Sequence, residues 1–156
     1  MIFNKDFSDF ISLLEKENVR YVLVGGLAVL MNGHFRTTKD MDIFYEPTEE
    51  NCLNLLKVID EFGFKYLKLT QQDLMDKNGF IKLGREPERI DLFCDLPGVS
   101  FGEVYKSAFQ YKDDDSDFVV KVIHINHLIQ NKKAVGRYQD LDDVKKLEKI
   151  LKRRKK

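Results

Sequence analysis

The stretch that decides the fold runs from residue 19 to residue 45 and reads VRYVLVGGLAVLMNGHFRTTKDMDIFY. Its β-branched and aromatic start, residues 19–24, is typical of a strand, and this strand ends at Gly25-Gly26. A short helix is expected over residues 27–32, which are mostly apolar and precede a glycine. Residues 41–45 predict a second strand. The stretch therefore predicts a strand, a glycine turn, a short helix and a further strand.

Outside this stretch, hydrophobic periodicity and turn residues predict further helices and strands. Their arrangement predicts an α/β fold with a small twisted mixed β-sheet, one face of which packs on helices. We expect one domain over residues 1–156, with a sheet-containing core over about 1–125 and C-terminal helices over about 126–156. The predicted helices cover residues 7–14 (capped by Asp6 or Ser8), 48–63, 101–108, 126–134 and 139–153, and the remaining predicted strands cover 64–69, 80–83, 89–94, 109–112 and 118–125.

The bulk composition predicts a soluble cytoplasmic protein. Basic and acidic residues balance at 26 each, so no overall field attracts nucleic acid. The basic segment at residues 145–156 is interpreted as a solvated helix face. Cys52 and Cys94 lie among apolar neighbours, which suits reduced core thiols better than a disulfide framework. No signal peptide and no membrane-spanning apolar run is found, so no membrane partner is expected.

Asp40 and Asp42 form a D-x-D pair at the start of the predicted strand 41–45. Side chains at positions i and i+2 of a strand face the same way, so the two carboxylates repel each other unless water or a cation lies between them. The spacing alone is weak evidence, because it recurs further along this Asp-rich chain. An exposed acidic strand edge is the alternative interpretation, but it leaves Asp42 unexplained inside an apolar run.

Asp91 interrupts the apolar strand 89–94 in the same way, and a charge at such a position needs a partner. If the two strands are neighbours, Asp91 completes a cluster of three carboxylates. Hard oxygen ligands of this kind suit Mg²⁺ or Mn²⁺ and leave coordination positions for phosphate oxygens. Asp95 lies about 13 Å further along the strand, too far to join the same ion.

The Gly25-Gly26 turn ahead of a helix offers free backbone N–H groups that phosphate can approach without meeting a Cβ atom. It lacks the G-x-G-x-x-G of a dinucleotide fold and the G-x-x-x-x-G-K-[ST] of a P-loop. A simple tight turn is the alternative interpretation of two adjacent glycines.

In combination, these motifs resemble the nucleotidyltransferase superfamily that includes DNA polymerase β. More narrowly, they are similar to small bacterial proteins related to AbiEii, the toxin component of type IV toxin–antitoxin systems. That family carries a pattern close to G-G-x-A, then a histidine or glycine, R-x-T and D-x-D. Many superfamily members have Gly-Ser where this chain has two glycines, which removes a hydroxyl that could touch phosphate. The pattern is matched in order by Gly25-Gly26-Leu27-Ala28, Gly33-His34, Arg36-Thr37-Thr38 and Asp40-Met41-Asp42.

The resemblance extends to the C-terminal helices, so it covers about residues 21–147. The family carries a lysine there, followed by a segment like R-x-K-D-x-x-D. Lys132 and the segment from Arg137 to Asp143 stand in those places, with Gln139 where the family has lysine. The resemblance implies that Lys132 and Asp140 belong to the catalytic site.

The resemblance further implies a nucleotidyltransferase fold and the transfer of a nucleoside monophosphate from a nucleoside triphosphate to an acceptor hydroxyl. Asp40, Asp42 and Asp91 would bind Mg²⁺ or Mn²⁺, and Asp91 could instead take the proton of the acceptor. The implied nucleotide-binding residues are Gly25, Gly26, Arg36 and Thr38.

Three functions remain open at this point. The first is a toxin-like enzyme that modifies a tRNA 3′ end or a protein hydroxyl, which would bring a possible cognate antitoxin as partner. The second is a small-molecule transferase of the antibiotic-modifying kind. The third is a domain of the same fold that binds nucleotide or a protein partner without turnover; three mutually repelling carboxylates argue against it.

Other candidate sites are weaker. The acidic run 113–117 imitates the start of a calcium loop but lacks the required glycine and glutamate, so it is interpreted as a hairpin turn. His124 and His127 straddle a predicted strand end and helix start, where a core or capping role is expected. His34 lies in a loop and receives no role.

Overall fold

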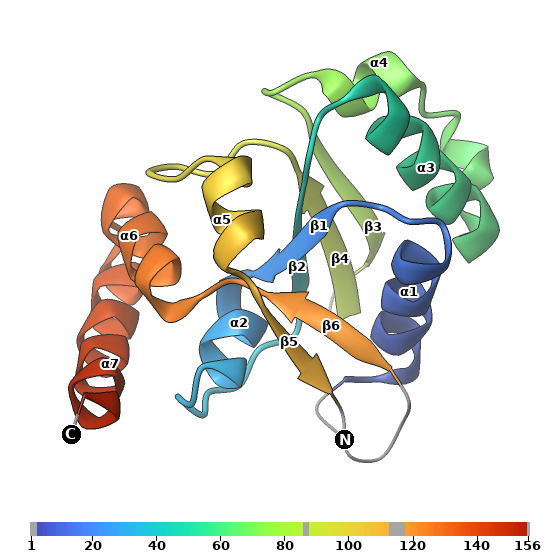
Figure 1. Cartoon of the computed structure of the whole chain (residues 1–156). Coiled ribbons are helices and arrows are strands. Elements are labelled where there is room, and N and C mark those ends of the chain that lie inside the picture. Colours follow the sequence, from blue (N-terminus) through green and yellow to red (C-terminus); the bar gives the residue numbers. More distant parts are fainter. Residues whose placement is uncertain (1–2, 86–87, 113–117, 156) are drawn as a thin grey trace.

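The computed structural model describes residues 3–85, 88–112 and 118–155. Six strands form one mixed sheet in the order β3-β4-β2-β1-β6-β5, and helices pack around it (Figure 1). This arrangement confirms the predicted α/β class. The strands are β1 (Tyr21–Val24), β2 (Met41–Tyr45), β3 (Phe80–Arg85), β4 (Glu88–Phe93), β5 (Phe109–Lys112) and β6 (Val119–Val122), and the α-helices are α1 (Lys5–Lys16), α2 (Gly25–Met31), α3 (Glu49–Ile59), α4 (Gln71–Met75), α5 (Phe101–Ser107), α6 (Ile125–Val135) and α7 (Tyr138–Arg154).

The centre of the sheet determines where the loops meet. β1 pairs with β2 antiparallel and with β6 parallel, and β2 pairs with β4 parallel. All four residues of β1 are buried, so both faces of the sheet are covered at this strand. The edge strands β3 and β5 each pair antiparallel with one neighbour. The N-terminal ends of β2 and β4 consequently lie side by side, next to the end of β1.

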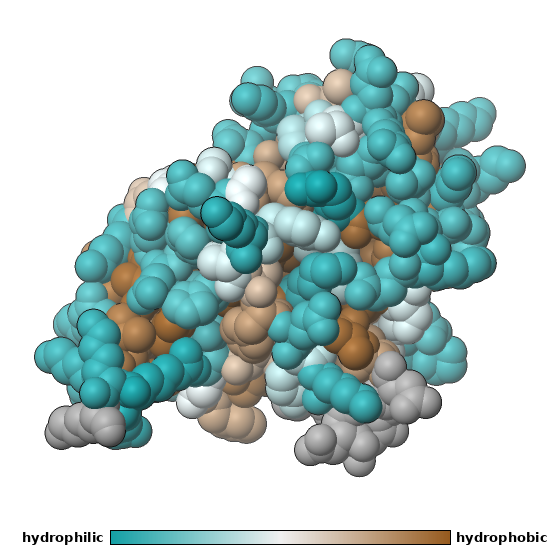
Figure 2. Space-filling view, in the orientation of Figure 1, coloured by the Kyte–Doolittle hydropathy of each residue, from teal (hydrophilic) through white to brown (hydrophobic). Residues whose placement is uncertain are grey.

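The helices divide into two groups in Figure 1. α1 and α3 lie on one side of the molecule, while α6 and α7 lie next to each other on the other side. The short helix α2 contacts β1, β2 and α6, so it links the sheet to the second group. Apolar residues reach the face drawn in Figure 2 only in patches between hydrophilic ones. Among the described residues, no helix combines the length and the apolar character that crossing a membrane requires.

Several local predictions are corrected. Asn4, rather than Asp6 or Ser8, caps α1, because its side-chain oxygen accepts a hydrogen bond from the N–H of Phe7 at 2.8 Å. The cap differs from the prediction because the helix begins at Lys5, before Phe7, the first of its buried apolar residues.

The predicted strand at residues 64–69 is wrong. The chain there forms a wide turn, η1 (Asp60–Phe64), and a short 3₁₀ segment, η2 (Lys65–Leu67). Gly63, at φ 108°, turns the chain out of α3, and the rings of Phe64 and Tyr66 pack on each other at 5.7 Å between centroids. No neighbouring strand is paired with this segment within the described part of the chain.

Other outcomes concern capping, cysteines and the acidic turn. His124 caps α6, with its ring nitrogen accepting a hydrogen bond from the N–H of Asn126. Cys52 and Cys94 are buried and unbridged, as expected. The expected hairpin turn at residues 113–117 lies outside the described residues.

Candidate active site

Asp42 and Asp91 are brought together by the pairing of β2 with β4. The two residues are Cα partners in a parallel register, so their side chains point to the same face of the sheet. Asp40 precedes β2 by one residue and lies close enough to raise the pKa of Asp42. Val24 is the Cα partner of Asp42 on the other side, which brings the glycine turn beside the same carboxylate.

The Gly25-Gly26 turn leaves no room for side chains. Gly25 adopts φ +69°, and a Cβ atom on it would overlap the carboxylate of Asp42. A Cβ atom on Gly26 would lie 2.7 Å from the hydroxyl oxygen of Thr38. Only glycine therefore fits at these two positions. We call the turn the glycine cradle: its backbone lies against the carboxylate of Asp42 at Gly25 and against the hydroxyl of Thr38 at Gly26.

The carboxylate cluster is electrostatically costly without a cation. Burial raises the pKa of Asp42 to about 7, and the negative charges of Asp91 and Asp40 add to the effect. Lys132 and Arg89 lower the same pKa, but they do not compensate for the burial and the repulsion. A group with these properties is stabilised by a divalent cation at the carboxylates.

Arg89 forms ion pairs with two of these carboxylates. Its guanidinium donates to both oxygens of Asp91, at 2.7 and 3.1 Å, and to Asp40 Oδ2 at 3.3 Å. Arg89 and Asp91 are two positions apart on β4, so both side chains lie on one face of the strand. This spacing is visible in the sequence and could have identified Arg89 as a same-strand counter-ion of Asp91.

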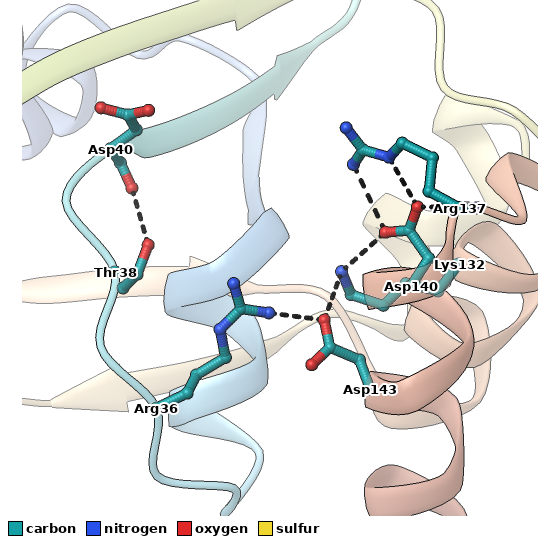
Figure 3. A network of polar contacts seen from close by, with 7 residues as sticks. All are labelled: Arg36, Thr38, Asp40, Lys132, Arg137, Asp140 and Asp143. Carbon is teal, nitrogen blue, oxygen red and sulfur yellow. Dashed lines mark hydrogen bonds and ion pairs between the residues drawn. The ribbon is translucent and has the colours of Figure 1, made fainter.

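The other side of the site is a network of charges, of which Lys132, Asp140 and Asp143 are buried between α6 and α7 (Figure 3). Lys132 Nζ lies 3.3 Å from Asp140 and 3.0 Å from Asp143. Asp143 also accepts from Arg36 at 2.5 Å, and Asp140 also accepts from Arg137 at 2.7 Å. Figure 3 shows Lys132 between the two carboxylates, with Arg36 reaching across from the loop before β2.

The network lowers the pKa of Asp140. Burial alone would raise the pKa of Asp140, but hydrogen bonds and positive charge from Arg137 and Lys132 outweigh it and hold this pKa below its usual value. The same pairing raises the pKa of Arg137. Lys132 and Asp140 are buried, so they are not ordinary charges of a helix surface.

A cavity of about 470 Å³ joins these elements. All nine residues singled out from the sequence lie on its wall, including the three aspartates, the two glycines and Lys132. The structure adds further residues that the sequence did not single out. The complete lining is Gly25, Gly26, Arg36, Thr37, Thr38, Lys39, Asp40, Asp42, Arg89, Asp91, Lys132, Arg137, Gln139 and Asp140.

A second cavity of similar size, about 480 Å³, lies elsewhere. Apolar residues such as Phe7 and Ile90 line it together with a few acidic ones. Ile90 faces away from its neighbour Asp91 on β4, so this cavity opens on the opposite face of the sheet. The charged residues among its described lining are all acidic, so none of them would bind a phosphate. Because the two cavities are nearly equal in volume, the chemistry of their linings decides which one is the candidate site.

The donor set in the first cavity fits Mg²⁺ or Mn²⁺. Asp40, Asp42 and Asp91 supply carboxylate oxygens, and the glycine cradle leaves space beside Asp42. Within the described ranges, however, no group of three or more His, Cys, Asp or Glu side chains is already arranged as a metal site. Two of the three carboxylates are instead ion-paired with Arg89.

Comparison of the sequence with known protein families finds no match, and comparison with curated proteins finds none. Comparison with solved structures does find similar folds. One is the crystal structure of the lincosamide antibiotic adenylyltransferase LnuA bound to lincomycin, with a TM-score of 0.52 and 13% sequence identity. The similarity covers 95% of this chain and 98% of that one. The chain therefore has a fold of the nucleotidyltransferase type.

Proposed function

We propose that the protein is a metal-dependent nucleotidyltransferase, which moves a nucleoside monophosphate from a nucleoside triphosphate to an acceptor hydroxyl. The observation that carries this proposal is the convergence of three carboxylates and a glycine cradle on one cavity. Lys132 and Arg137 line the same cavity from the C-terminal helices. The cavity thus offers carboxylates that can hold a metal ion and cations that can stabilise the phosphates bound to it.

In this proposal each wall of the cavity has a separate task. Asp40 and Asp42 hold Mg²⁺ or Mn²⁺, and Asp91 completes the ligand set or accepts the proton of the attacking hydroxyl. When bound, the metal neutralises the triphosphate and aligns its α-phosphorus with the acceptor. The amides of Gly25-Gly26 and the hydroxyl of Thr38 contact the outer phosphates.

The C-terminal helices supply positive charge to the triphosphate. Lys132 is held by Asp140 and Asp143, and its ammonium lies close enough to Asp42 to lower its pKa. Arg36, which also bonds to Asp143, positions this network and adds charge to the cavity wall. These groups stabilise the part of the triphosphate's negative charge that the metal does not neutralise.

In the reaction, the acceptor hydroxyl oxygen bonds to the α-phosphorus of the triphosphate. The bond from this phosphorus to the bridging oxygen breaks, and pyrophosphate leaves. The proton of the hydroxyl passes to a carboxylate of the cavity or to water. No oxidant or further reactant is needed.

As acceptor we favour tRNA or protein. The protein would then be a toxin-like enzyme of the AbiEii-like kind that acts in the cytoplasm, with a possible cognate antitoxin as partner. The motifs that resemble this family support it, since they follow one another in the family's order. A small-molecule acceptor is the second candidate. The fold shared with an adenylyltransferase crystallised with lincomycin supports that alternative.

The proposed activity is tested by incubating the purified protein with Mg²⁺, each labelled nucleoside triphosphate and total cell extract. We expect label to enter RNA, protein or small molecules in the wild type and in an Asp95→Asn control. Asp42→Asn should incorporate label more slowly by orders of magnitude. Equal labelling by wild type and Asp42→Asn, or none by either with any triphosphate, contradicts the proposal.

A further inference from the structure

Arg89 bonds to two of the three carboxylates that are proposed to hold the metal. Its guanidinium makes two bonds to Asp91, at 2.7 and 3.1 Å, and a third to Asp40 at 3.3 Å. The side chain of Asp91 is only 6% exposed, whereas that of Arg89 is 21% exposed. A partly exposed cation thus neutralises a buried anion whose unpaired burial would be costly.

The guanidinium bonds to carboxylate oxygens that would also be needed to hold a metal ion. A cation shared by Asp40 and Asp91 uses oxygen lone pairs that a bridging divalent ion would also use. A planar guanidinium bonded in a fork to one carboxylate cannot share both of its oxygens with an ion at full strength. The two cations therefore compete for the same acceptors.

On this basis, and resting on the proposed function, we infer that Arg89 is an internal counter-ion of the metal-free site, which a divalent cation has to displace from Asp40 and Asp91. Arg89 then has two roles. It stabilises the folded protein without metal, and it raises the metal concentration that is needed to fill the site. It is a positioning residue rather than a catalytic one.

The sheet offers a matched control at Lys82. This residue is the Cα partner of Asp91 on β3, so it lies beside the same carboxylate in the register. Its ammonium, however, lies over the ring of Phe80, 5.2 Å from the centroid, and is not ion-paired with the three aspartates. Lys82→Gln removes one positive charge near the site and leaves the bonds of Arg89 in place.

The experiment measures binding of Mn²⁺ alone, by calorimetry and by electron paramagnetic resonance, to wild type, Arg89→Gln and Lys82→Gln. We expect Arg89→Gln to bind Mn²⁺ about ten-fold more tightly than wild type, the size that a charge-assisted hydrogen bond gives. Lys82→Gln should change the Kd less than about two-fold, as expected for a screened charge. Arg89→Gln should also melt earlier than wild type in the absence of metal.

Equal or weaker Mn²⁺ binding by folded Arg89→Gln overturns the inference, since Arg89 would then assist the ligands rather than compete. A similar gain in Lys82→Gln also overturns it, because a general charge effect would explain both. If Arg89→Gln does not fold, Arg89→Lys decides. It keeps the charge and loses the fork, so tighter binding than wild type supports the inference, and equal or weaker binding overturns it.

Failure of the proposed function has a different signature. In that case the wild type itself binds no Mn²⁺ at millimolar concentration, and the inference about Arg89 fails with it. Where the wild type binds Mn²⁺ and only the variant behaves against expectation, the metal site stands and the inference alone fails.

Discussion

Asp42 lies between β1 and β4, and its burial together with the negative charge of Asp91 on β4 raises the pKa of its carboxyl. Val24 flanks it on one side and Asp91 on the other, and the glycine turn closes over it. Because its pKa is raised to about 7, the folded protein binds the proton of Asp42 more tightly than the unfolded chain does. This contribution to stability is full below about pH 4 and is lost as the pH rises through about 7.

The first prediction follows from this linkage. In metal-free protein at pH 8, Asp42→Asn should be more stable than wild type by at most about 4 kcal/mol, because it keeps the shape and removes the repelled charge. At pH 4 the two proteins should be equally stable. Unfolding by denaturant in the presence of a chelator, measured from pH 4 to pH 8, checks this.

Asp95→Asn is the control, since Asp95 is exposed and lies outside the cavity. It should change the free energy of unfolding by less than about 0.5 kcal/mol at every pH. A variant Asp42→Asn that unfolds earlier than wild type at pH 8 would mean that Asp42 is a structural aspartate. The catalytic assignment would then fail.

A second prediction concerns Gly25, whose missing side chain leaves room for the Asp42 carboxylate. Gly25→Ala should displace that carboxylate and weaken Mn²⁺ binding by more than ten-fold, besides the strain of a positive φ, about 1 kcal/mol. Gly136→Ala is matched in backbone conformation, at φ +71° against +69°, and its nearest neighbour is 3.5 Å away. It should lose similar stability and keep Mn²⁺ binding. Equal binding by both variants would contradict the prediction.

Among single residues, the sequence reveals those whose charge interrupts an apolar strand. Asp42 and Asp91 could be singled out because each interrupts an apolar strand. Arg89 was missed, although its spacing of two residues from Asp91 on the same strand is visible in the sequence. The bond between Arg36 and Asp143 was hidden from the sequence, because it joins positions 107 apart and no local spacing reflects it.

At the scale of elements, α6 and α7 act through the charges buried between them. Asp143 bonds to both Lys132 and Arg36, so its removal leaves the buried Lys132 and the partly buried Arg36 with less compensating negative charge. Asp143→Ala should lower the free energy of unfolding by about 3 kcal/mol. Thermal melting and denaturant unfolding measure this loss.

The control for Asp143 lies on the same helix. Glu148 pairs with Lys133 at 3.1 Å, but both side chains are about half exposed. Glu148→Ala should therefore cost less than about 1 kcal/mol. If both variants lose the same small amount, the buried charges do not hold the helices together.

Helices and strands with a regular apolar pattern were predictable, and irregular segments were not. The residues that α1 buries, such as Phe7 and Leu14, recur at helical spacing in the sequence. The segment after Gly63 has strand-like composition, yet its aromatic rings find partners in one another instead of in a neighbouring strand. The five-residue helix α4 is too short for a periodic signal, so the sequence analysis missed it.

At the scale of the whole molecule, the cavity joins the sheet to the C-terminal helices. A triphosphate that contacts both Gly26 and Lys132 would link the two parts and stabilise the folded state. At a free concentration of 100 times Kd, Mg²⁺ with a suitable nucleoside triphosphate should add about 2.7 kcal/mol. This corresponds to a rise in Tm of roughly 5 to 10 °C for a chain of this size.

The measurement is thermal melting with Mg²⁺ and each of the four ribonucleoside triphosphates in turn. Hydrogen exchange should show the added protection in α2 and α6, which border the cavity. Asp42→Asn should lose the rise in Tm. If no triphosphate raises the Tm of the wild type, the cavity does not hold a nucleotide.

Strand order was the part of the whole fold that the sequence could not supply. The meeting of Asp42 with Asp91 depends on β2 and β4 being neighbours, which the sequence analysis could state only as a condition. Periodicity shows that a strand exists and which side is apolar, but not which strand it pairs with. The condition is met by the register of the sheet.

The long reach of the contacts around the cavity also bears on how the molecule forms and decays. The Arg89–Asp40 bond spans 49 positions and the Arg36–Asp143 bond spans 107. Contacts that close such large loops form late in folding, because the chain entropy lost on closure is recovered only once the surrounding structure is in place. Interactions absent from the transition state change the rate of unfolding and leave the rate of folding nearly unaffected. These two long-range contacts therefore prolong the life of the native protein and add little to the speed at which it forms.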